Sequence, residues 1–498
     1  MSGDRPRLGD RAVKGFFWNY GAIAGGRAFF FVATLVLARE LSPQDFGVVA
    51  FTLAVLAYLE AVTSHGLGET LVYRKDGNDP ALASTVFWLS VATSIVLVLV
   101  MWGLADPIAS LGPDDESLVL VVQVLSIELL ITSFGNTQAY MLRHSMRFDR
   151  LFVPQLVGGF VKGATAIVLA LAGFGVWSLV IGQLAGSSVR TFGYWSISDW
   201  RPSLTFARDR ARSLLRKGSG FAVIAVIAGA GRNADYLIIG VTLGTTALGF
   251  YYLAFRLPEL VIVGPFQAAW QVLFPAYARV SDRESDPAVA TEALERGFRD
   301  SVRIASMVAL PVCTVIAALA SPLVLTLYGS PWEPSVAPLA LISLWAGIAA
   351  VSGMAGVVLK SLGRTGTLTT ATTVSTAVRL PVIWFATYGG ITAVAFAQLA
   401  VQLVWLVGIF VVVARVLDAE VRAILAPIIP AVVVSVVVGA AAWLPTTMLP
   451  PAPSLVVGSS LALLVYGFLV HRFCAEVLDL VVGALRRLTP RRRTSVLS

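Results

Sequence analysis

The feature of this sequence that most constrains its fold is a series of long apolar runs separated by short polar breaks. A helix of about 20 apolar residues is roughly 30 Å long, which matches the hydrocarbon core of a bilayer. Because 57% of the residues are hydrophobic and only 13% are charged, the composition excludes a water-soluble globular protein. The sequence therefore predicts an all-α polytopic membrane protein. The runs predict fourteen transmembrane helices, at residues 16–38, 46–65, 82–104, 118–138, 151–172, 177–195, 218–240, 249–272, 302–323, 336–358, 366–388, 390–413, 423–444 and 454–473.

The basic residues predict how these helices are oriented. Lys and Arg concentrate in alternate loops and in both terminal segments, whereas the opposite loops hold Arg39 and otherwise only acidic or uncharged residues. Since basic loops stay in the cytoplasm, this alternation predicts that both termini are cytoplasmic. The topology accounts for the net charge of +8, so no nucleic-acid partner is predicted.

Three short matches indicate an internal duplication. Residues 41–47 and 243–249 both begin with Leu and end in an apolar residue followed by Gly, and 142–147 and 359–364 share a Leu-basic-x-x-x-Arg pattern. Gly175 precedes Gln183 by the same spacing that separates Gly390 from Gln398. Each pair lies six predicted helices apart, so we expect two six-helix lobes that enter the membrane in the same sense, as a parallel pseudo-repeat. The predicted division is an N-terminal lobe at 1–195, a basic cytoplasmic linker at 196–217, a C-terminal lobe at 218–414, two C-terminal helices at 415–473 and a basic cytoplasmic tail at 474–498.

Charged residues inside the predicted helices are the candidate site. Each costs about 3 kcal/mol at mid-bilayer depth, so these side chains must face protein or water rather than lipid. Basic residues outnumber acidic ones among them, and an anion such as a pyrophosphate would balance the excess. We predict a cationic, substrate-binding cavity lined by Arg27, Lys162, Arg256 and Arg379. The alternative for these residues is an interhelical ion pair that only fixes packing, and Arg190 is expected to extend to the cytoplasmic surface.

The acidic residues in the predicted helices are Glu60, Glu128, Asp235 and Glu259. Glu259 follows Arg256 by three residues, so the two side chains lie on one helix face and can partly neutralise each other. A structural pair between Glu128 and Lys162 is equally compatible with the sequence. The acids are therefore either structural partners of the cations or functional groups in their own right.

No motif in the sequence indicates an enzyme. There is no P-loop, and the loops predicted to lie outside are too short to hold a catalytic domain. The two cysteines and three histidines do not cluster in the sequence. We therefore expect a transporter with no catalytic residue, no cofactor and no metal site.

Several short segments carry a resemblance to a known family. They are Phe16-Phe17-Trp18-Asn19, residues 38–47 and 66–75, Asn233–Gly240, Leu248–Tyr252 and Phe274-Pro275. In this order they resemble the polysaccharide-unit flippases (Wzx type, polysaccharide transporter family) of the multidrug/oligosaccharidyl-lipid/polysaccharide (MOP) exporter superfamily. The resemblance covers the first eight predicted helices well and the remainder mainly by topology.

This resemblance implies a flippase that moves an undecaprenyl-diphosphate-linked oligosaccharide, a lipopolysaccharide or exopolysaccharide repeat unit, from the cytoplasmic to the outer leaflet by alternating access. It places the chain in the bacterial cytoplasmic (inner) membrane, with membrane lipid and other polysaccharide-assembly proteins as partners. The chain also looks like the lipid II flippases, whose cavities use arginines on the first and eighth helices, the helices that carry Arg27 and Arg256 here. Coupling to H+ or Na+ is common in such families, and the candidate coupling residues are Glu60, Glu128, Asp235 and Glu259.

Three other functions compete with this interpretation. A cation-coupled drug or metabolite exporter of the same superfamily would need an acidic cavity for cationic drugs, which the excess of basic residues disfavours. A membrane glycan polymerase or ligase would need a sizeable outside loop with catalytic residues. A scaffold without transport activity would leave the central cations unexplained.

Overall fold

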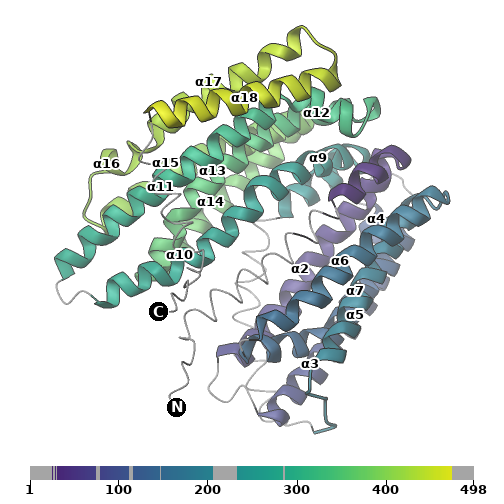
Figure 1. The fold of residues 1–498 in the computed structure, drawn as a ribbon. Coiled ribbons are helices and arrows are strands. Elements are labelled where there is room, and N and C mark those ends of the chain that lie inside the picture. The colour runs from purple at the N-terminus through teal and green to yellow at the C-terminus, as the bar shows by residue number, and fades with distance from the viewer. Residues whose placement is uncertain are drawn as a thin grey trace, which may run out of the picture. The chain divides into compact units, whose positions relative to one another are not determined.

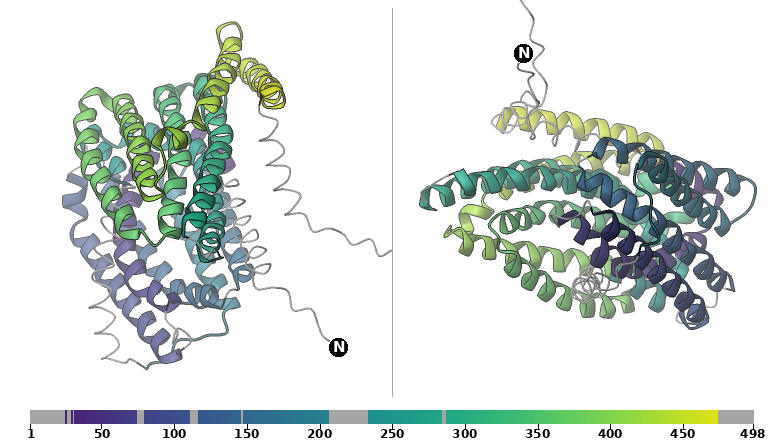
Figure 2. Two further views of the ribbon diagram at one scale, coloured as in Figure 1. Left: turned by 90° about the vertical axis from the view of Figure 1, so that its left-hand side faces the viewer. Right: turned by 90° about the horizontal axis from the view of Figure 1, so that it is seen from below.

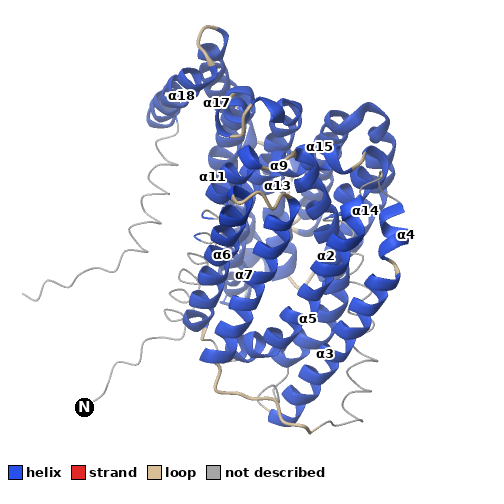
Figure 3. Cartoon of the chain, turned by 90° about the vertical axis from the view of Figure 1, so that its right-hand side faces the viewer, coloured by secondary structure: helices blue, strands red, loops and turns tan. Residues whose placement is uncertain are grey.

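The computed structural model describes Gly25, Phe29 and residues 31–73, 79–110, 116–145, 147–205, 233–283 and 287–473. Within these residues the chain forms helices and connecting loops and no strand (Figure 3). The predicted all-α class is therefore confirmed. The chain divides into two compact units, of which unit 1 comprises Met1–Gly264, Leu327–Pro338 and Thr369–Gln398, and unit 2 comprises Pro265–Thr326, Leu339–Leu368 and Leu399–Ser498. The division into two six-helix lobes stays a prediction.

Nine helical segments in the described residues are long and apolar enough to cross a bilayer. One of them, Thr365–Val416, has 52 residues and would be about 78 Å long as a single helix, more than twice the hydrocarbon thickness. It is instead broken after Ala386 by a 3₁₀ turn and by Gly390, whose φ of 77° ends one helix and starts the next. The chain is thus a multi-pass membrane protein, and the exact count of fourteen helices stays a prediction.

Unit 1 is built from long helices that run alongside one another, in purple and blue in Figures 1 and 2. Within it α6 packs on α7, α5 packs on α3 and α7, and α2 packs on α5 and α9. Its helices are α2 (Pro43–Tyr73), α3 (Pro80–Gly103), α4 (Ala105–Ser110), α5 (Glu116–His144), α6 (Phe148–Leu171), α7 (Val176–Ile197) and α9 (Thr245–Pro258), followed by the π-turn η1 (Glu259–Val263) and the short η2 (Ser330–Ser335). Unit 1 also contains most of α14 (Thr365–Ala386) and the start of α15 (Gly390–Val416). Residues 31–40 and Asn233–Leu243 are also helical.

Local sequence explains where two of these helices begin. At the start of α2 the backbone N–H of Ser42 donates to the Asp45 carboxylate at 2.9 Å, and the N–H of Asp45 donates to Ser42 Oγ at 3.2 Å. This reciprocal arrangement is a capping box, which satisfies donors that have no partner inside the helix. At the start of α3 the Asp79 carboxylate accepts from the N–H of Ala81 at 2.9 Å, and Pro80 occupies the first helical position, where its missing N–H costs nothing.

The contact between α2 and α9 is unusually close. A Cβ atom added to Gly47 would overlap the backbone carbonyl of Thr245, and one added to Gly249 would overlap the carbonyl of Pro43. Each glycine therefore provides the space that the other helix's backbone occupies. Small residues at such positions let helices in a membrane approach closely, where van der Waals packing provides most of the attraction.

Unit 2 contains the C-terminal helices. Here α17 packs between α11 and α18, and Tyr466 Oη on α18 donates to the carbonyl of Met307 on α11 at 3.0 Å. Most of their exposed side chains are apolar, as expected for helices that face lipid. The remaining labelled helices of the chain are α10 (Gly264–Arg283), α11 (Pro287–Ala318), α12 (Ala320–Leu327), α13 (Val336–Ser361), α16 (Val421–Leu425), α17 (Ile428–Trp443) and α18 (Pro451–Phe473).

Trp332 anchors η2 inside unit 1. Its side chain is fully buried, packs edge-on against Phe46 and Phe250, and donates from Nε1 to the carbonyl of Ala38 at 2.7 Å. We expect Trp332→Phe to destabilise the protein by about 2 kcal/mol, because the buried Ala38 carbonyl would lose this donor. Thermal unfolding of the purified protein in detergent measures the effect. Trp443→Phe is the matched control, because Trp443 is 54% exposed and its loss should leave the unfolding midpoint unchanged. Equal midpoints for the wild type and Trp332→Phe would contradict the prediction.

Candidate functional site

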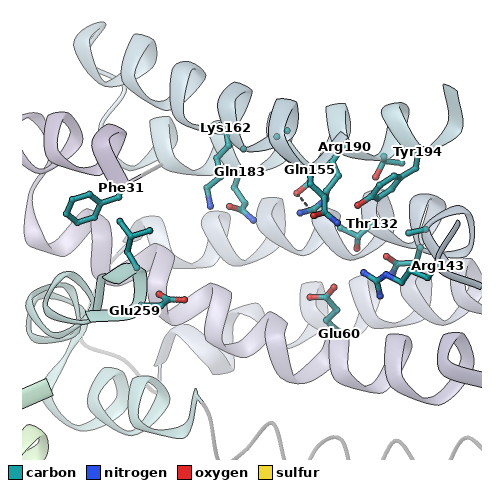
Figure 4. Close-up of a pocket in the computed structure, with 18 of the residues that line it drawn as sticks. Phe31, Glu60, Thr132, Arg143, Gln155, Lys162, Gln183, Arg190, Tyr194 and Glu259 are labelled. Carbon is teal, nitrogen blue, oxygen red and sulfur yellow. Dashed lines mark hydrogen bonds between the residues drawn. The ribbon is translucent and has the colours of Figure 1, made fainter. Parts of the chain in front are cut away.

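Unit 1 contains an open cavity of about 460 Å³ lined by α2, α5, α6, α7 and the end of α9. Four of the residues that line it are basic and two are acidic, so its walls carry a formal excess of two positive charges. Figure 4 shows Lys162 and Arg190 along one wall, Arg143 at one end of the cavity, and Glu60 and Glu259 on the helices opposite Lys162 and Arg190. The charged lining residues are Arg143, Lys162, Arg190, Arg256, Glu60 and Glu259.

Uncharged polar groups fill the spaces between these charges. Asn136 and Thr132 on α5, Gln155 on α6 and Thr191 on α7 all line the cavity. Amides and hydroxyls both donate and accept hydrogen bonds, so this lining suits a ligand that carries many hydroxyl groups. The cavity therefore combines a cationic lining with hydrogen-bonding capacity at mid-helix positions.

Glycines hold α6 and α7 close together at the cationic wall. A Cβ added to Gly158 would lie 2.8 Å from the carbonyl oxygen of Gly186, and one added to Gly186 would lie 2.7 Å from Lys162 Cβ. Gly182 and Gly186 are four residues apart and share one face of α7, and Arg190 continues that face. The crossing therefore sets the positions at which the Lys162 and Arg190 side chains leave their helices.

Arg256 is held at the opposite side by an ion pair and an aromatic ring. Its guanidinium lies 3.2 Å from the Glu259 carboxylate and 4.0 Å from the centre of the Tyr252 ring. Pro258 and the following π-turn, Glu259–Val263, interrupt the regular helix at this point. Such wide turns re-aim side chains and occur often at functional sites. Arg256, Glu259 and Leu260 all face the cavity as a result.

Glu128 lies behind the cationic wall rather than in the lining. Its carboxylate accepts from Gln183 Nε2 at 2.7 Å and from Ser187 Oγ at 2.6 Å, and Arg190 donates to the same Ser187 Oγ at 3.4 Å. These two hydrogen bonds give the buried carboxylate polar partners inside the protein. This network connects α5 to the α7 face that presents Arg190.

A second polar cluster lies elsewhere in unit 1. Asp235 is 7% exposed, and its carboxylate accepts from Gln398 Nε2 at 2.7 Å and from Tyr251 Oη at 3.2 Å. Gln398 also donates to Tyr251 Oη at 2.6 Å, and the positive charge of Arg379 acts on Asp235. These contacts give the buried Asp235 carboxylate the partners that it needs inside the protein.

With this geometry established, comparison with known proteins identifies the family. The family model of polysaccharide biosynthesis proteins matches residues 36–337, which is more than half of the chain. The chain belongs to this family. The predicted relationship to the Wzx-type polysaccharide transporters of the MOP superfamily is therefore confirmed.

The names of individual relatives of this chain agree with this family assignment. The chain is 27% identical over 332 residues to the succinoglycan biosynthesis transport protein ExoT of Rhizobium meliloti. This alignment covers 66% of this chain and 65% of ExoT. It is 24% identical over 366 residues to the lipopolysaccharide biosynthesis protein WzxC of Escherichia coli, and this alignment covers 72% of this chain and 71% of WzxC. The match to ExoT thus leaves about a third of that protein's length uncovered.

Solved structures show the same fold. An inward closed conformation of the lipid II flippase MurJ matches with a TM-score of 0.73 at 14% identity and covers 91% of this chain and 98% of that one. An inward-facing MATE family transporter of the MOP superfamily matches with a TM-score of 0.63 at 16% identity, covering 79% of this chain and 94% of that one. At these identities the likeness establishes the fold alone.

The structure brings together four of the eight predicted site residues of this family member. Lys162, Arg256, Glu60 and Glu259 line one cavity. Three others lie outside that lining: Glu128 is behind it, and Asp235 and Arg379 are in the second cluster. The eighth, Arg27, lies outside the described residues. The functional roles of all eight stay predictions.

Sequence reasoning missed two of the four basic cavity residues, Arg143 and Arg190. Arg190 was expected to extend to the surface, but its side chain lines the cavity. The spacing of Gly182, Gly186 and Arg190 at four-residue intervals places Arg190 on the packed face of its helix, and this signal could have identified it. Arg143 lies in the last turn of α5 and is indistinguishable in sequence from an ordinary loop cation.

Proposed function

We propose that this protein is a flippase and not an enzyme. Its substrate is an undecaprenyl-diphosphate-linked oligosaccharide, a lipopolysaccharide or exopolysaccharide repeat unit, which it moves from the cytoplasmic to the outer leaflet of the bacterial inner membrane. The observation that carries the proposal is the excess of basic over acidic side chains in a cavity whose walls include α5, α6 and α9, which belong to segments long and apolar enough to cross a membrane. The names of the polysaccharide-transport relatives support it.

The physical difficulty of the task matches this cavity. A diphosphate and its attached sugars would lose their water in the hydrocarbon core, which costs several kcal/mol for each polar group without a partner. Lys162 and Arg256 would replace water at the phosphate oxygens, and Asn136 and Gln155 would do so at sugar hydroxyls. A cavity of about 460 Å³ is large enough for the diphosphate and the first sugars, while the prenyl chain stays in lipid.

Orientation, mechanism and coupling belong to the same proposal. With basic loops inside, the Arg143 end of the cavity faces the cytoplasm, and two six-helix lobes would alternate access to the two leaflets. Coupling to H+ or Na+ would involve an acid that senses the substrate, and we favour Glu60 and Glu259 for this role because they line the cavity. Glu128 and Asp235 remain candidates that would act from outside the lining.

A deletion of the gene tests the proposal. We expect the strain to lose its surface glycan and to accumulate undecaprenyl-diphosphate-linked oligosaccharide in the cytoplasmic leaflet, where externally added glycan-modifying enzymes cannot reach it. Expression of the wild-type chain should restore both properties. An unchanged surface glycan together with increased sensitivity to cationic drugs would contradict the proposal and favour a drug exporter of the same superfamily.

A further inference from the structure

Lys162 and Arg190 are adjacent cations on one wall of the cavity. The glycine crossing of α6 and α7 places the Cβ atoms of both residues at a single helix contact: Arg190 Cβ is 3.0 Å from a Cβ built on Gly158, and Lys162 Cβ is 2.7 Å from one built on Gly186. Both side chains then line the same cavity, as Figure 4 shows. Their positive charges act on each other. The carboxylates of Glu128 and Glu259 also act on Lys162. The cavity lining nevertheless has four basic and two acidic side chains, so an anion bound between Lys162 and Arg190 would be stabilised there.

The hydrogen bonds around Arg190 leave its charge available to such an anion. Its guanidinium donates to a neutral hydroxyl, Ser187 Oγ, at 3.4 Å, and Arg190 takes part in none of the salt bridges between described residues of unit 1. The nearby Glu128 carboxylate is instead engaged by Ser187 and Gln183 at 2.6 and 2.7 Å. Glu128 thus holds in place the Ser187 hydroxyl that accepts the hydrogen bond from Arg190.

We propose that Lys162 and Arg190 form a diphosphate clamp on the α6–α7 wall, and that Glu128 is a positioning residue that holds Arg190 through Ser187. This inference rests on the proposed function. It adds Arg190, which the sequence did not predict, to the side chains that contact the diphosphate. A guanidinium can donate two parallel hydrogen bonds to one phosphoryl group, while the ammonium acts as a point charge on the other. The clamp therefore recognises two linked phosphoryl groups rather than the sugars.

Titration of the purified full-length protein in nanodiscs tests the clamp. The probes are inorganic pyrophosphate and farnesyl diphosphate, which separate recognition of the diphosphate itself from recognition of its prenyl chain. We expect Arg190→Gln to bind both probes at least about tenfold more weakly than the wild type, because a charge-assisted hydrogen bond is lost. Arg190→Lys should recover part of the lost affinity, because lysine keeps the positive charge but cannot donate two parallel hydrogen bonds. The matched control is Arg147→Gln, because Arg147 lies outside the cavity lining and pairs with the exposed Asp199 at 3.5 Å.

The role of Glu128 needs a separate pair of variants. Glu128→Ala removes the acceptor of Ser187 and should weaken pyrophosphate binding about fivefold, whereas Glu128→Gln keeps an acceptor oxygen and should bind within about twofold of the wild type. Rescue by the conservative variant separates positioning of Arg190 from a requirement for the carboxylate charge. Thermal unfolding of each variant confirms that it is folded.

The possible failures are distinguishable. If the wild type binds and Arg190→Gln binds equally well, the clamp is wrong and the proposed function stands. If Glu128→Ala binds like the wild type, or Glu128→Gln is as weak as Glu128→Ala, the positioning role is wrong. If the wild type binds neither probe, the proposed function and the clamp both fail.

Discussion

Arg256→Ala is expected to reduce export of surface glycan at least about tenfold while the protein still inserts in normal amounts. Arg256 faces the cavity, and its loss would remove a charge-assisted contact to phosphate worth about 1.5–3 kcal/mol. The loss would also leave the Glu259 carboxylate, now 3.2 Å from the guanidinium, without this partner and in the path of an anionic substrate. Surface glycan in a deletion strain that expresses the variant measures the effect.

Two further variants make this test specific. Arg256→Ala combined with Glu259→Gln should export more glycan than Arg256→Ala alone, because the repelling carboxylate is gone. Arg296→Ala is the matched control: Arg296 pairs with Glu292 at 2.8 Å, but both side chains are about two-thirds exposed and lie outside the cavity lining. Normal export by Arg256→Ala would refute the cavity assignment. By the family resemblance, Arg27→Ala should fail in the same way.

Gly47→Ala should destabilise the protein by about 3 kcal/mol or more and strongly reduce its yield. The added Cβ would overlap the Thr245 carbonyl, and backbone atoms cannot rotate aside as the end of a flexible side chain can. The helices α2 and α9 would have to separate over the whole contact. Thermal unfolding and the amount of monodisperse protein in detergent report the change.

The control for this substitution has the opposite expected sign. Gly408 lies inside α15, and a Cβ added there meets no atom within 4 Å. Gly408→Ala should therefore be neutral or slightly stabilising, because alanine favours a helix by up to about 1 kcal/mol over glycine. Equal unfolding midpoints for Gly47→Ala and Gly408→Ala would show that the contact between α2 and α9 is looser than described.

Much of the fold could be predicted from the sequence because apolar length is a direct consequence of bilayer thickness. The run predicted at 336–358 is α13, Val336–Ser361, and the run at 390–413 is α15, Gly390–Val416. Features that depend on a single backbone step were not predictable. The run predicted at 302–323 hides the break at Leu319 between α11 and α12, and the π-turn after Pro258 has no apolar-pattern signal.

The candidate site was predictable only in part, because depth in the membrane identifies a costly charge but not its surroundings. Lys162 was found by its depth, whereas Arg256 was found by its place inside a predicted helix and by the family resemblance, and both line the cavity. Arg379 is also deep, yet it acts on Asp235, which precedes it by more than a hundred residues. Only the packing of distant helices decides between a cavity and a buried cluster, and sequence periodicity contains no such information.

The contact between α2 and α9 has a consequence for how this family member can change over evolutionary time. Gly47 lies against the backbone of α9, and Gly249 lies against the backbone of α2. A side chain at either position would push the two helices apart. The separated helices would then have space for a side chain at the other position as well. The two substitutions should then cost little more together than either alone. A lineage that loses one of these glycines has little reason to keep the other, so the pair should be retained or lost jointly.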